Sequence, residues 1–273
     1  MTFLLPAFAF EIVTAGEMTR RRGRFIQRIQ SGYDGPVIIA EGDSWFCYPR
    51  DSIWVPDEAP VDVIQQLAEE FAVNGVGKPG DTAQSMAEFF AFVAQDIQTW
   101  DAHILLLSAG GNDLLGEGRL ASYLRDGDRP IPQYLKPAFH GLVADVLTRL
   151  ERMIRAARVA KPDIKIVLHG YDYAEPSGRG PWLKAPMDLL GIPADRQPAI
   201  VRSIVDSFYS RLANLADDLD DELADRQGEI VVLDLRGTVE DAWYDELHPN
   251  TVGFARIRDL YRKTILALHP MVA

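Results

Sequence analysis

The sequence has only one cysteine, Cys47, among its 273 residues, so no disulfide bond can form within the chain. A lone thiol is compatible with a reducing compartment. A run of about 18 apolar residues is also missing, which argues against a membrane-spanning helix. Residues 1–10 are apolar, but no basic segment precedes them and Glu11 follows directly, so they do not fit a signal peptide. We therefore expect a cytoplasmic protein without a membrane span.

Positive charge is scarce as well, because 28 Lys and Arg residues stand against 40 Asp and Glu residues, a net charge of −12. Such a chain is a poor partner for nucleic acid or for an anionic membrane. The acidic run at residues 217–222 is interpreted as the solvated face of a helix. The basic cluster at residues 20–24 is interpreted as a surface helix or as a contact with the acidic body of a neighbour, which leaves a homo-oligomer open.

The composition is otherwise that of a globular protein, with 47% hydrophobic and 25% charged residues. After residue 35, apolar runs typical of buried strands alternate with segments of helical period. The expected strands span residues 36–40, 72–76, 104–108, 164–169 and 230–235. The expected helices span residues 61–71, 82–100, 139–160, 200–223 and 251–268, with Asp81 or Thr82 as a helix cap.

This alternation predicts a parallel sheet covered by helices on both faces, in one domain over residues 36–273 that follows an N-terminal extension, residues 1–35. Right-handed crossovers place the loops that follow the strands at one edge of the sheet, where ligands bind. Residues 171–197 are rich in Pro and Gly. Loops of this length are commonly functional, so we interpret the segment as a lid or pocket wall, the alternative being a plain surface loop.

Four short motifs could supply the chemistry, and three of them directly follow a strand-type run. They are Gly42-Asp43-Ser44, Gly80-Asp81-Thr82, Gly110-Gly111-Asn112-Asp113 and Asp245-Glu246-Leu247-His248-Pro249. Taken singly, such motifs are typical of turns. Together they contain a serine nucleophile, a base, a group to orient the base and donors for an oxyanion, which are the parts needed for acyl transfer.

Ser44 follows the first strand after a Gly-Asp turn. A serine there can cap a helix, but the position also exposes a hydroxyl at the sheet edge, beside backbone N–H groups. Asp43 is too close in sequence to be the base for Ser44, and we expect it to bond backbone amides of the turn. The surrounding residues do not form the Gly-x-Ser-x-Gly elbow of the α/β-hydrolases.

Asp245 and His248 lie three residues apart, just before the last helix. His248 alone would be interpreted as a packed histidine near a helix capped by Asn250 or Thr251. A carboxylate that holds Nδ1–H, however, leaves Nε2 facing a serine, so the pair is a candidate base and orienter. Asn112 is either a turn former or a donor to an oxyanion.

The four blocks resemble those of the SGNH (GDSL-type) hydrolases, in that family's order and over about residues 36–268. The resemblance implies a flavodoxin-like, three-layer α/β/α fold with a parallel five-stranded sheet of order 2-1-3-4-5. It implies Ser44 as nucleophile, His248 as base and Asp245 as its orienter. The implied oxyanion donors are the backbone N–H groups of Ser44 and Gly80 and the side chain of Asn112. No cofactor and no metal are expected.

Trp45 departs from the commonest form of the first block, in which leucine follows Gly-Asp-Ser. Gly75 and Gly77 lie near the second block too, and we choose Gly80 because Gly-Asp-Thr fits the family pattern best. The aromatic candidates for the substrate pocket, each of which could instead be core, are Trp45, Phe46, Tyr173 and Trp182, with Tyr48, Trp54 and Tyr171. His169 and Asp172 are candidates for contacting a polar head group or for a structural role.

The sequence therefore predicts a serine esterase acting on a small-molecule, glycan or lipid ester. An acyltransferase with the same triad and a non-catalytic binding protein on the same fold are the alternatives. A metallophosphoesterase with Asp43, Asp113 and His248 as ligands is disfavoured, because no Asp-x-His pair follows the first strand. A nucleotide-binding module is disfavoured because residues 77–80 do not complete a phosphate-binding loop.

Overall fold

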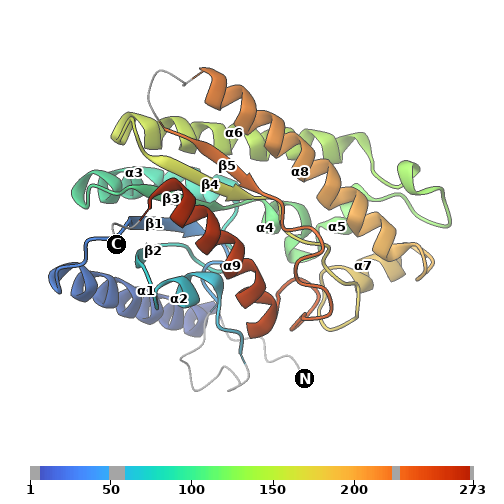
Figure 1. The fold of residues 1–273 in the computed structure, drawn as a ribbon. Helices are drawn as coiled ribbons and strands as arrows, with labels where there is room; N and C mark the ends of the chain where they lie inside the picture. Colours follow the sequence, from blue (N-terminus) through green and yellow to red (C-terminus); the bar gives the residue numbers. More distant parts are fainter. Residues whose placement is uncertain (1–6, 49–58, 223–227, 271–273) are drawn as a thin grey trace.

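The computed structural model describes residues 7–48, 59–222 and 228–270. These residues form a five-stranded parallel sheet in the order β2-β1-β3-β4-β5, which confirms the predicted order (Figure 1). Its strands are β1 (Val37–Gly42), β2 (Ala72–Gly75), β3 (Ile104–Ser108), β4 (Lys165–His169) and β5 (Ile230–Leu233). Every residue of β3 is buried, as expected of a central strand covered on both faces.

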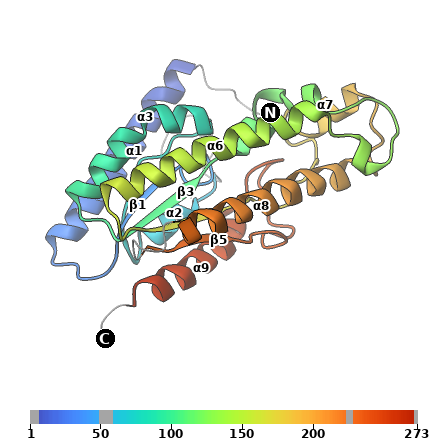
Figure 2. The same ribbon diagram turned by 90° about the horizontal axis from the view of Figure 1, so that it is seen from above.

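Helices form a layer on each face of this sheet (Figures 1 and 2). One layer contains α3 (Ala83–Thr99), α6 (Pro137–Ala160) and α8 (Gln197–Glu222), and the other contains α2 (Val63–Leu67) and α9 (Thr251–Leu268). The three-layer α/β/α arrangement is therefore the one predicted. The hydrophobic core occupies the two interfaces between the sheet and the helices. None of the described helices is both long and apolar enough to span a bilayer.

Several element boundaries differ from the prediction for local reasons. α2 is shorter than the expected helix over residues 61–71, because Asp62 caps it at Gln65 N–H and residues 68–70 already form turns. β1 runs two residues further than expected, since Glu41 and Gly42 still pair with β3. β5 ends at Leu233, and residue 223 of the expected fourth helix lies outside the described residues.

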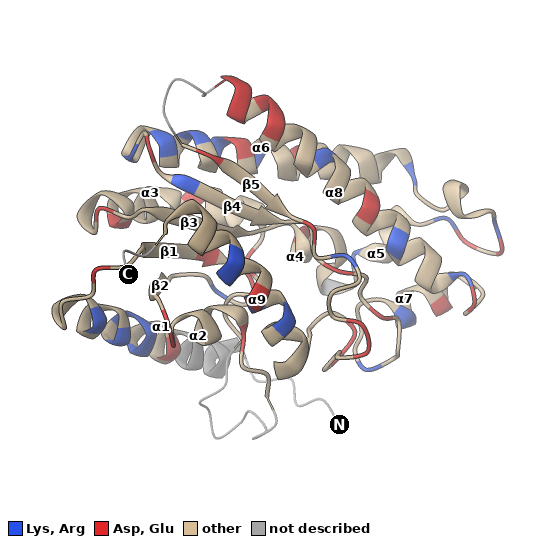
Figure 3. Ribbon diagram, viewed as in Figure 1, with Lys and Arg blue, Asp and Glu red and all other residues tan. Residues whose placement is uncertain are grey.

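The caps agree better with the prediction. Thr82 caps α3 through a reciprocal capping box with Ser85, and Asn250 caps α9 by accepting from the N–H groups of Val252 and Gly253. The acidic run lies at the end of α8, where Asp217, Asp218, Asp221 and Glu222 are exposed, as predicted (Figure 3).

The structure also contains short helices that the sequence pattern did not predict. These are α4 (Gly111–Leu115), α5 (Leu120–Tyr123), α7 (Lys184–Leu189) and the 3-10 turns at Gly116–Gly118 and Ile131–Gln133. The predicted lid segment, residues 171–197, therefore includes one helix, α7. Its action as a lid stays a prediction, as does the division of the chain at residues 35 and 36.

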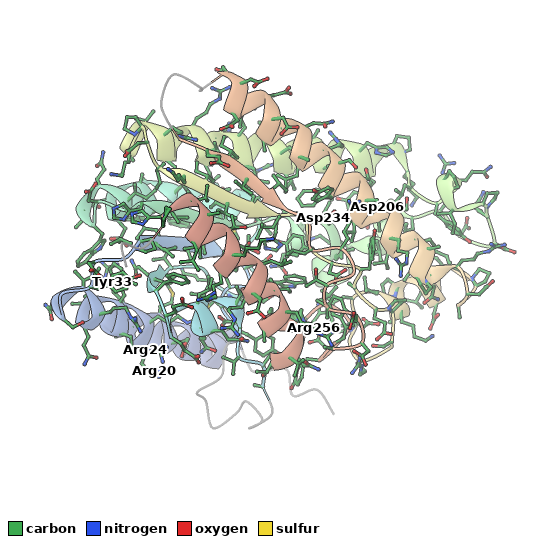
Figure 4. The ribbon with its side chains drawn as sticks, viewed as in Figure 1. Arg20, Arg24, Tyr33, Asp206, Asp234 and Arg256 are labelled. Atoms are coloured by element: carbon green, nitrogen blue, oxygen red, sulfur yellow. The ribbon has the colours of Figure 1, made fainter. Side chains whose placement is uncertain are left out.

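The basic cluster lies on a long helix, α1 (Ala7–Gln30), which packs beside the edge strand β2 (Figure 1). Arg20 and Arg24 project from its outer side, with 44% and 57% of their side chains exposed (Figure 4). Arg21, in contrast, is buried and forms ion pairs with the buried carboxylates of Glu17 and Asp62. Only part of the cluster is therefore a solvated helix surface.

Arg21 reaches the loop that follows β1. Its Nη1 donates to the carbonyl oxygen of Phe46 at 2.6 Å, while Asp62 also accepts from the backbone N–H of Tyr48 at 2.9 Å. Breaking a buried ion pair by removing one partner leaves an uncompensated charge, which is costly. Through Arg21 and its partner Asp62, α1 thus stabilises the loop at residues 46–48.

Candidate active site

Ser44, His248 and Asp245 meet at the edge of the sheet where the parallel strands end. Ser44 Oγ lies 2.7 Å from His248 Nε2, and His248 Nδ1 lies 2.9 and 2.8 Å from the two carboxylate oxygens of Asp245. The side chains of His248 and Asp245 are each only 12% exposed. An Nδ1–H donated to Asp245 leaves the lone pair of Nε2 for the hydroxyl of Ser44.

The loop that carries Asp245 and His248 holds itself closed. Asp245 Oδ1 accepts from the backbone N–H groups of Leu247 and His248, both at 2.8 Å. The N–H of Tyr244 donates to the carbonyl of His248 at 2.8 Å. Burial works against ionisation of Asp245, but the His248 ring and these N–H groups outweigh it, so its pKa is lowered.

Ser44 lies in a tight turn directly after β1, in which the N–H groups of Phe46 and Cys47 donate to the carbonyl of Asp43. The Asp43 carboxylate accepts from Trp45 N–H at 3.0 Å, as expected from the sequence, and also from Ser108 Oγ at 3.1 Å and Tyr171 Oη at 2.6 Å. Burial raises the pKa of Asp43 to about 6, although these three donors partly oppose the shift. Asp43 therefore fixes the turn that presents Ser44.

Asn112 lies at the start of α4, and Gly80 lies in the neighbouring loop that precedes α3. Asn112, in the first turn of α4, donates through Nδ2 to the carbonyl of Asp81 at 3.0 Å. Asp113 accepts from the N–H of Ala83 at 2.8 Å, at the start of α3. Because an amide NH₂ has two hydrogens, the bond to Asp81 orients Asn112 and leaves one hydrogen for another acceptor.

Two of the candidate glycines of the second block, Gly80 and Gly77, differ in their backbone requirements. Gly80 has φ +83°, a conformation that favours glycine, and open space where a Cβ would be. A Cβ on Gly77 would lie 2.2 Å from the carbonyl oxygen of Gly42, so Gly77 permits a close approach of two backbones. Gly80 lies in the loop to which Asn112 is bonded, but it does not line the cavity beside Ser44.

A cavity that is partly open to solvent adjoins Ser44, Asn112 and His248. Its remaining wall is largely apolar. The apolar lining residues are Leu114, Leu115, Ala174, Ile204, Val205 and Phe208. The carboxylate of Asp172 also lies at the wall, but it accepts from the N–H groups of Gly237 and Val239 and thereby has a structural role.

The aromatic residues predicted to line the pocket lie in different parts of the structure. Trp45 and Tyr171 line the cavity. Phe46 is buried in the core, 2% exposed, with its ring against Tyr261. Tyr173 points to α8, where its hydroxyl donates to Asp206 at 2.8 Å. Arg236 donates hydrogen bonds to both Asp206 and Asp234. These two carboxylates lie close together in Figure 4.

The other aromatic candidates lie around the histidines. Trp182 and Tyr48 stand edge-on to the His248 ring, with centroid distances of 5.8 and 5.2 Å. His169 is fully buried beneath Trp45, and burial lowers its pKa to about 3, so it is neutral and structural. Trp54 lies outside the described residues.

A family model gives the first comparison with known proteins. Residues 40–256 match the model of the GDSL-like Lipase/Acylhydrolase family. This chain belongs to that family. The match contains Ser44, Asn112 and His248, and membership is consistent with the hydrolysis of esters. Curated proteins, in contrast, include no match to the sequence.

Solved structures of esterases and lipases share the fold of this GDSL-like protein. A carbohydrate esterase family 3 protein from Talaromyces cellulolyticus is 15% identical, with a TM-score of 0.50 over 85% of this chain and 98% of that one. The lipase Lip_vut3 from a goat rumen metagenome is 14% identical, with a TM-score of 0.51 over 84% of this chain and 96% of that one. At such identities the likeness concerns the fold alone.

The three residues that a metallophosphoesterase would use as metal ligands have other partners in this GDSL-like chain. Asp43 and Asp113 accept the hydrogen bonds described above, and His248 lies between Ser44 and Asp245. Across residues 7–48, 59–222 and 228–270, no three His, Cys, Asp or Glu side chains are grouped as metal ligands.

Sequence reasoning missed two residues of the site. The sequence pattern suggests Tyr171 only as a pocket aromatic, yet its hydroxyl donates to the carboxylate of Asp43, and its own φ of +65° is unusual for a residue with a side chain. Glu246 received no role, although it lies inside the fourth motif and is fully buried. The sequence does contain a signal for Glu246, because an acidic residue inside a motif of catalytic type is a candidate for a role at the site.

Proposed function

We propose that this protein hydrolyses a carboxylic ester through an acyl-enzyme on Ser44, with His248 as base and Asp245 as orienter. The observation that supports this best is the continuous line of hydrogen bonds from Ser44 Oγ to His248 Nε2 and from His248 Nδ1 to Asp245. The order of these three residues along the chain differs from the serine proteases, but the roles are recognised by geometry.

The proton path follows from this geometry. His248 Nε2 takes the proton of the Ser44 hydroxyl as Oγ bonds to the ester carbonyl carbon, and the carbonyl oxygen becomes an oxyanion. The C–O bond to the alcohol then breaks, and His248 returns the proton to the departing alkoxide. In the second half, water gives a proton to His248 and adds to the acyl carbon, and Ser44 leaves with that proton.

The oxyanion would be bound by the N–H groups of Ser44 and Gly80 and by Asn112. The support is strongest for Asn112, whose side chain lines the cavity beside Ser44 and is oriented by Asp81. A donor fixed in advance stabilises developing charge without reorganising during the reaction. The Ser44 N–H is supported by the turn that Asp43 holds. Gly80 is supported only by its place in the adjoining loop.

The cavity indicates which part of an ester binds beside the nucleophile. Leu115, Ile204 and Phe208 are apolar, and each is less than 10% exposed. Burying a methylene there gains about 0.8 kcal/mol. We therefore assign the cavity to the acyl group and expect an uncharged, apolar acyl chain.

The test compares wild type with Ser44→Ala on p-nitrophenyl esters of acyl chains from two to eight carbons. We expect wild type to turn over part of the panel and Ser44→Ala to lose at least about 10³-fold in kcat. Ser122→Ala, on an exposed residue, is the matched control and should behave as wild type. No turnover by wild type, or equal turnover by Ser44→Ala, would refute the assignment.

A fluorophosphonate probe separates an esterase from a non-catalytic binding protein on the same fold. The probe forms a bond to an activated serine, so wild type and Ser122→Ala should be labelled at Ser44 and Ser44→Ala should not.

A further inference from the structure

Glu246 lies between the two loop members of the triad and has no part in the proton path. Its side chain is fully buried, and its carboxylate accepts four backbone hydrogen bonds from one segment. Oε1 accepts from the N–H groups of Gly178 at 3.1 Å and Lys184 at 3.0 Å, and Oε2 accepts from those of Trp182 and Leu183, both at 2.9 Å. A single carboxylate therefore fastens residues 178–184 to the loop that carries His248.

Two further hydrogen bonds join the same two parts of the chain. The N–H of Glu175 donates to the backbone carbonyl of Glu246 at 3.2 Å, and Arg179 Nη1 donates to the carbonyl of Trp243 at 3.1 Å. Hydrogen bonds to a charged group are worth roughly twice those between neutral groups. The carboxylate of Glu246 is thus the main attachment of this segment, and the backbone bonds are supplementary.

The attached segment holds Trp182 against the imidazole of His248. Their ring centroids are 5.8 Å apart and their planes are nearly perpendicular, at 85°. Trp182 is partly exposed and does not line the apolar cavity, whereas His248 does. The indole therefore borders the histidine outside the acyl site, where the alcohol receives its proton and departs.

We propose that Glu246 is a positioning residue, which fastens residues 178–184, and that Trp182 thereby determines specificity for the alcohol part of the ester. The assignment of Trp182 rests on the proposed function. A large aromatic surface packs well against another ring, with a polar tip left for a hydroxyl. The alcohol part is therefore one with a flat apolar face, a shared property of phenols and of sugar rings.

The first experiment measures how firmly the segment is attached, without any ester. Arg179 is exposed within the segment, so trypsin can cleave after it when the segment detaches. Glu246→Gln replaces one acceptor oxygen by an NH₂ group that faces N–H donors, and we expect cleavage after Arg179 to become at least about 5-fold faster. Glu88→Gln, the same substitution on an exposed residue of α3 outside this segment, is the matched control and should cleave as wild type.

The second experiment measures specificity with acetyl esters that differ only in the alcohol: ethyl acetate, phenyl acetate and an acetylated methyl glucoside. We expect Trp182→Ala to lower kcat/KM for the ring-bearing esters about 3- to 10-fold more than for ethyl acetate, chiefly through KM. Trp182→Phe should restore part of the loss. Comparing the loss on phenyl acetate with the loss on the acetylated glucoside shows whether the ring of the alcohol is that of a phenol or that of a sugar.

Glu246→Gln should produce the same change in alcohol preference, and Glu246→Gln combined with Trp182→Ala should lose little more than either alone, because both act through one contact. The dependence on acyl-chain length should stay as in wild type. Unchanged cleavage after Arg179 in Glu246→Gln would overturn the positioning role. An equal loss on all three esters in Trp182→Ala would overturn the specificity role.

Failure of the proposed function has a different signature. A wild type that neither hydrolyses esters nor is labelled at Ser44 would remove the esterase, and with it the alcohol assignment of Trp182. The comparison of tryptic cleavage would still decide the role of Glu246.

Discussion

Trp45 donates a hydrogen bond through its indole Nε1 to the carbonyl oxygen of Leu247, 3.0 Å away. The bond joins the residue after the candidate nucleophile to the residue before the candidate base, across 202 positions of sequence. The indole also stacks on His169 at 5.4 Å and meets the edge of Tyr171 at 5.1 Å. Trp45, which stands where the commonest first block has leucine, therefore links the loop that carries Ser44 to the loop that carries His248.

Trp45→Phe keeps an aromatic ring but cannot donate to Leu247. We expect kcat to fall about 10-fold or more, because small displacements of catalytic groups have large effects on rate. The measurement is kcat and KM on the most reactive ester, beside the melting temperature. Trp243→Phe, which changes a neighbouring buried indole, is the control. A variant with the kcat of wild type would show that the link is not needed for alignment.

Asn112→Ala removes the proposed side-chain oxyanion donor. The expected loss is about 10²–10³ in kcat, with KM little changed, since the bond strengthens as charge develops in the transition state. The bond to Asp81 is lost too, so the unfolding free energy should be measured in parallel. A loss of stability with undiminished kcat would mean that Asn112 only joins the two loops.

Ala174→Leu adds three carbon atoms to a residue at the wall of the proposed acyl cavity. We expect the preference among p-nitrophenyl esters to shift to shorter acyl chains, because the added carbons occupy space that the end of a longer chain would fill. The measurement is the ratio of kcat/KM for hexanoyl and acetyl esters. Ala156→Leu on α6, a residue that does not line this cavity, is the control. An unchanged ratio would place the acyl chain elsewhere.

Glu41→Gln tests a buried carboxyl at the end of β1. Burial first, and then the charge of Asp81, raises the pKa of Glu41 from 4.5 to about 8. The folded protein thus keeps a proton that the unfolded chain releases, so the stability present below pH 4.5 is lost progressively up to pH 8, by about 1.4 kcal/mol per pH unit at most.

The stability of Glu41→Gln relative to wild type should therefore rise between pH 5 and pH 8, as followed by urea denaturation at each pH. Asp43, whose pKa is also raised, is present in both proteins, and its charge is one of the causes that raise the pKa of Glu41. Glu88→Gln, on an exposed residue, should show no such trend. An equal difference at both pH values would mean that Glu41 titrates normally in the folded protein.

The sequence was sufficient for the sheet because each buried strand is a short apolar run, and for the candidate triad because Asp245 and His248 are close together in one motif. Contacts between side chains outside such motifs were not predictable in this way. Arg21 lies among other arginines, and nothing in that cluster indicates that this one turns inward to Glu17 and Asp62. Tertiary packing decides such contacts, as it does for Tyr173 on Asp206.

The helix that carries Arg21 also matters to anyone who wishes to attach the protein to a bead or electrode. Because Arg21 donates a hydrogen bond to the carbonyl of Phe46, two positions after Ser44, tension on α1 would be transmitted to the turn that carries Ser44. A tether at the end of α9 would instead pull on a helix that begins at Thr251, three residues after His248, so its tension would be transmitted to the candidate base.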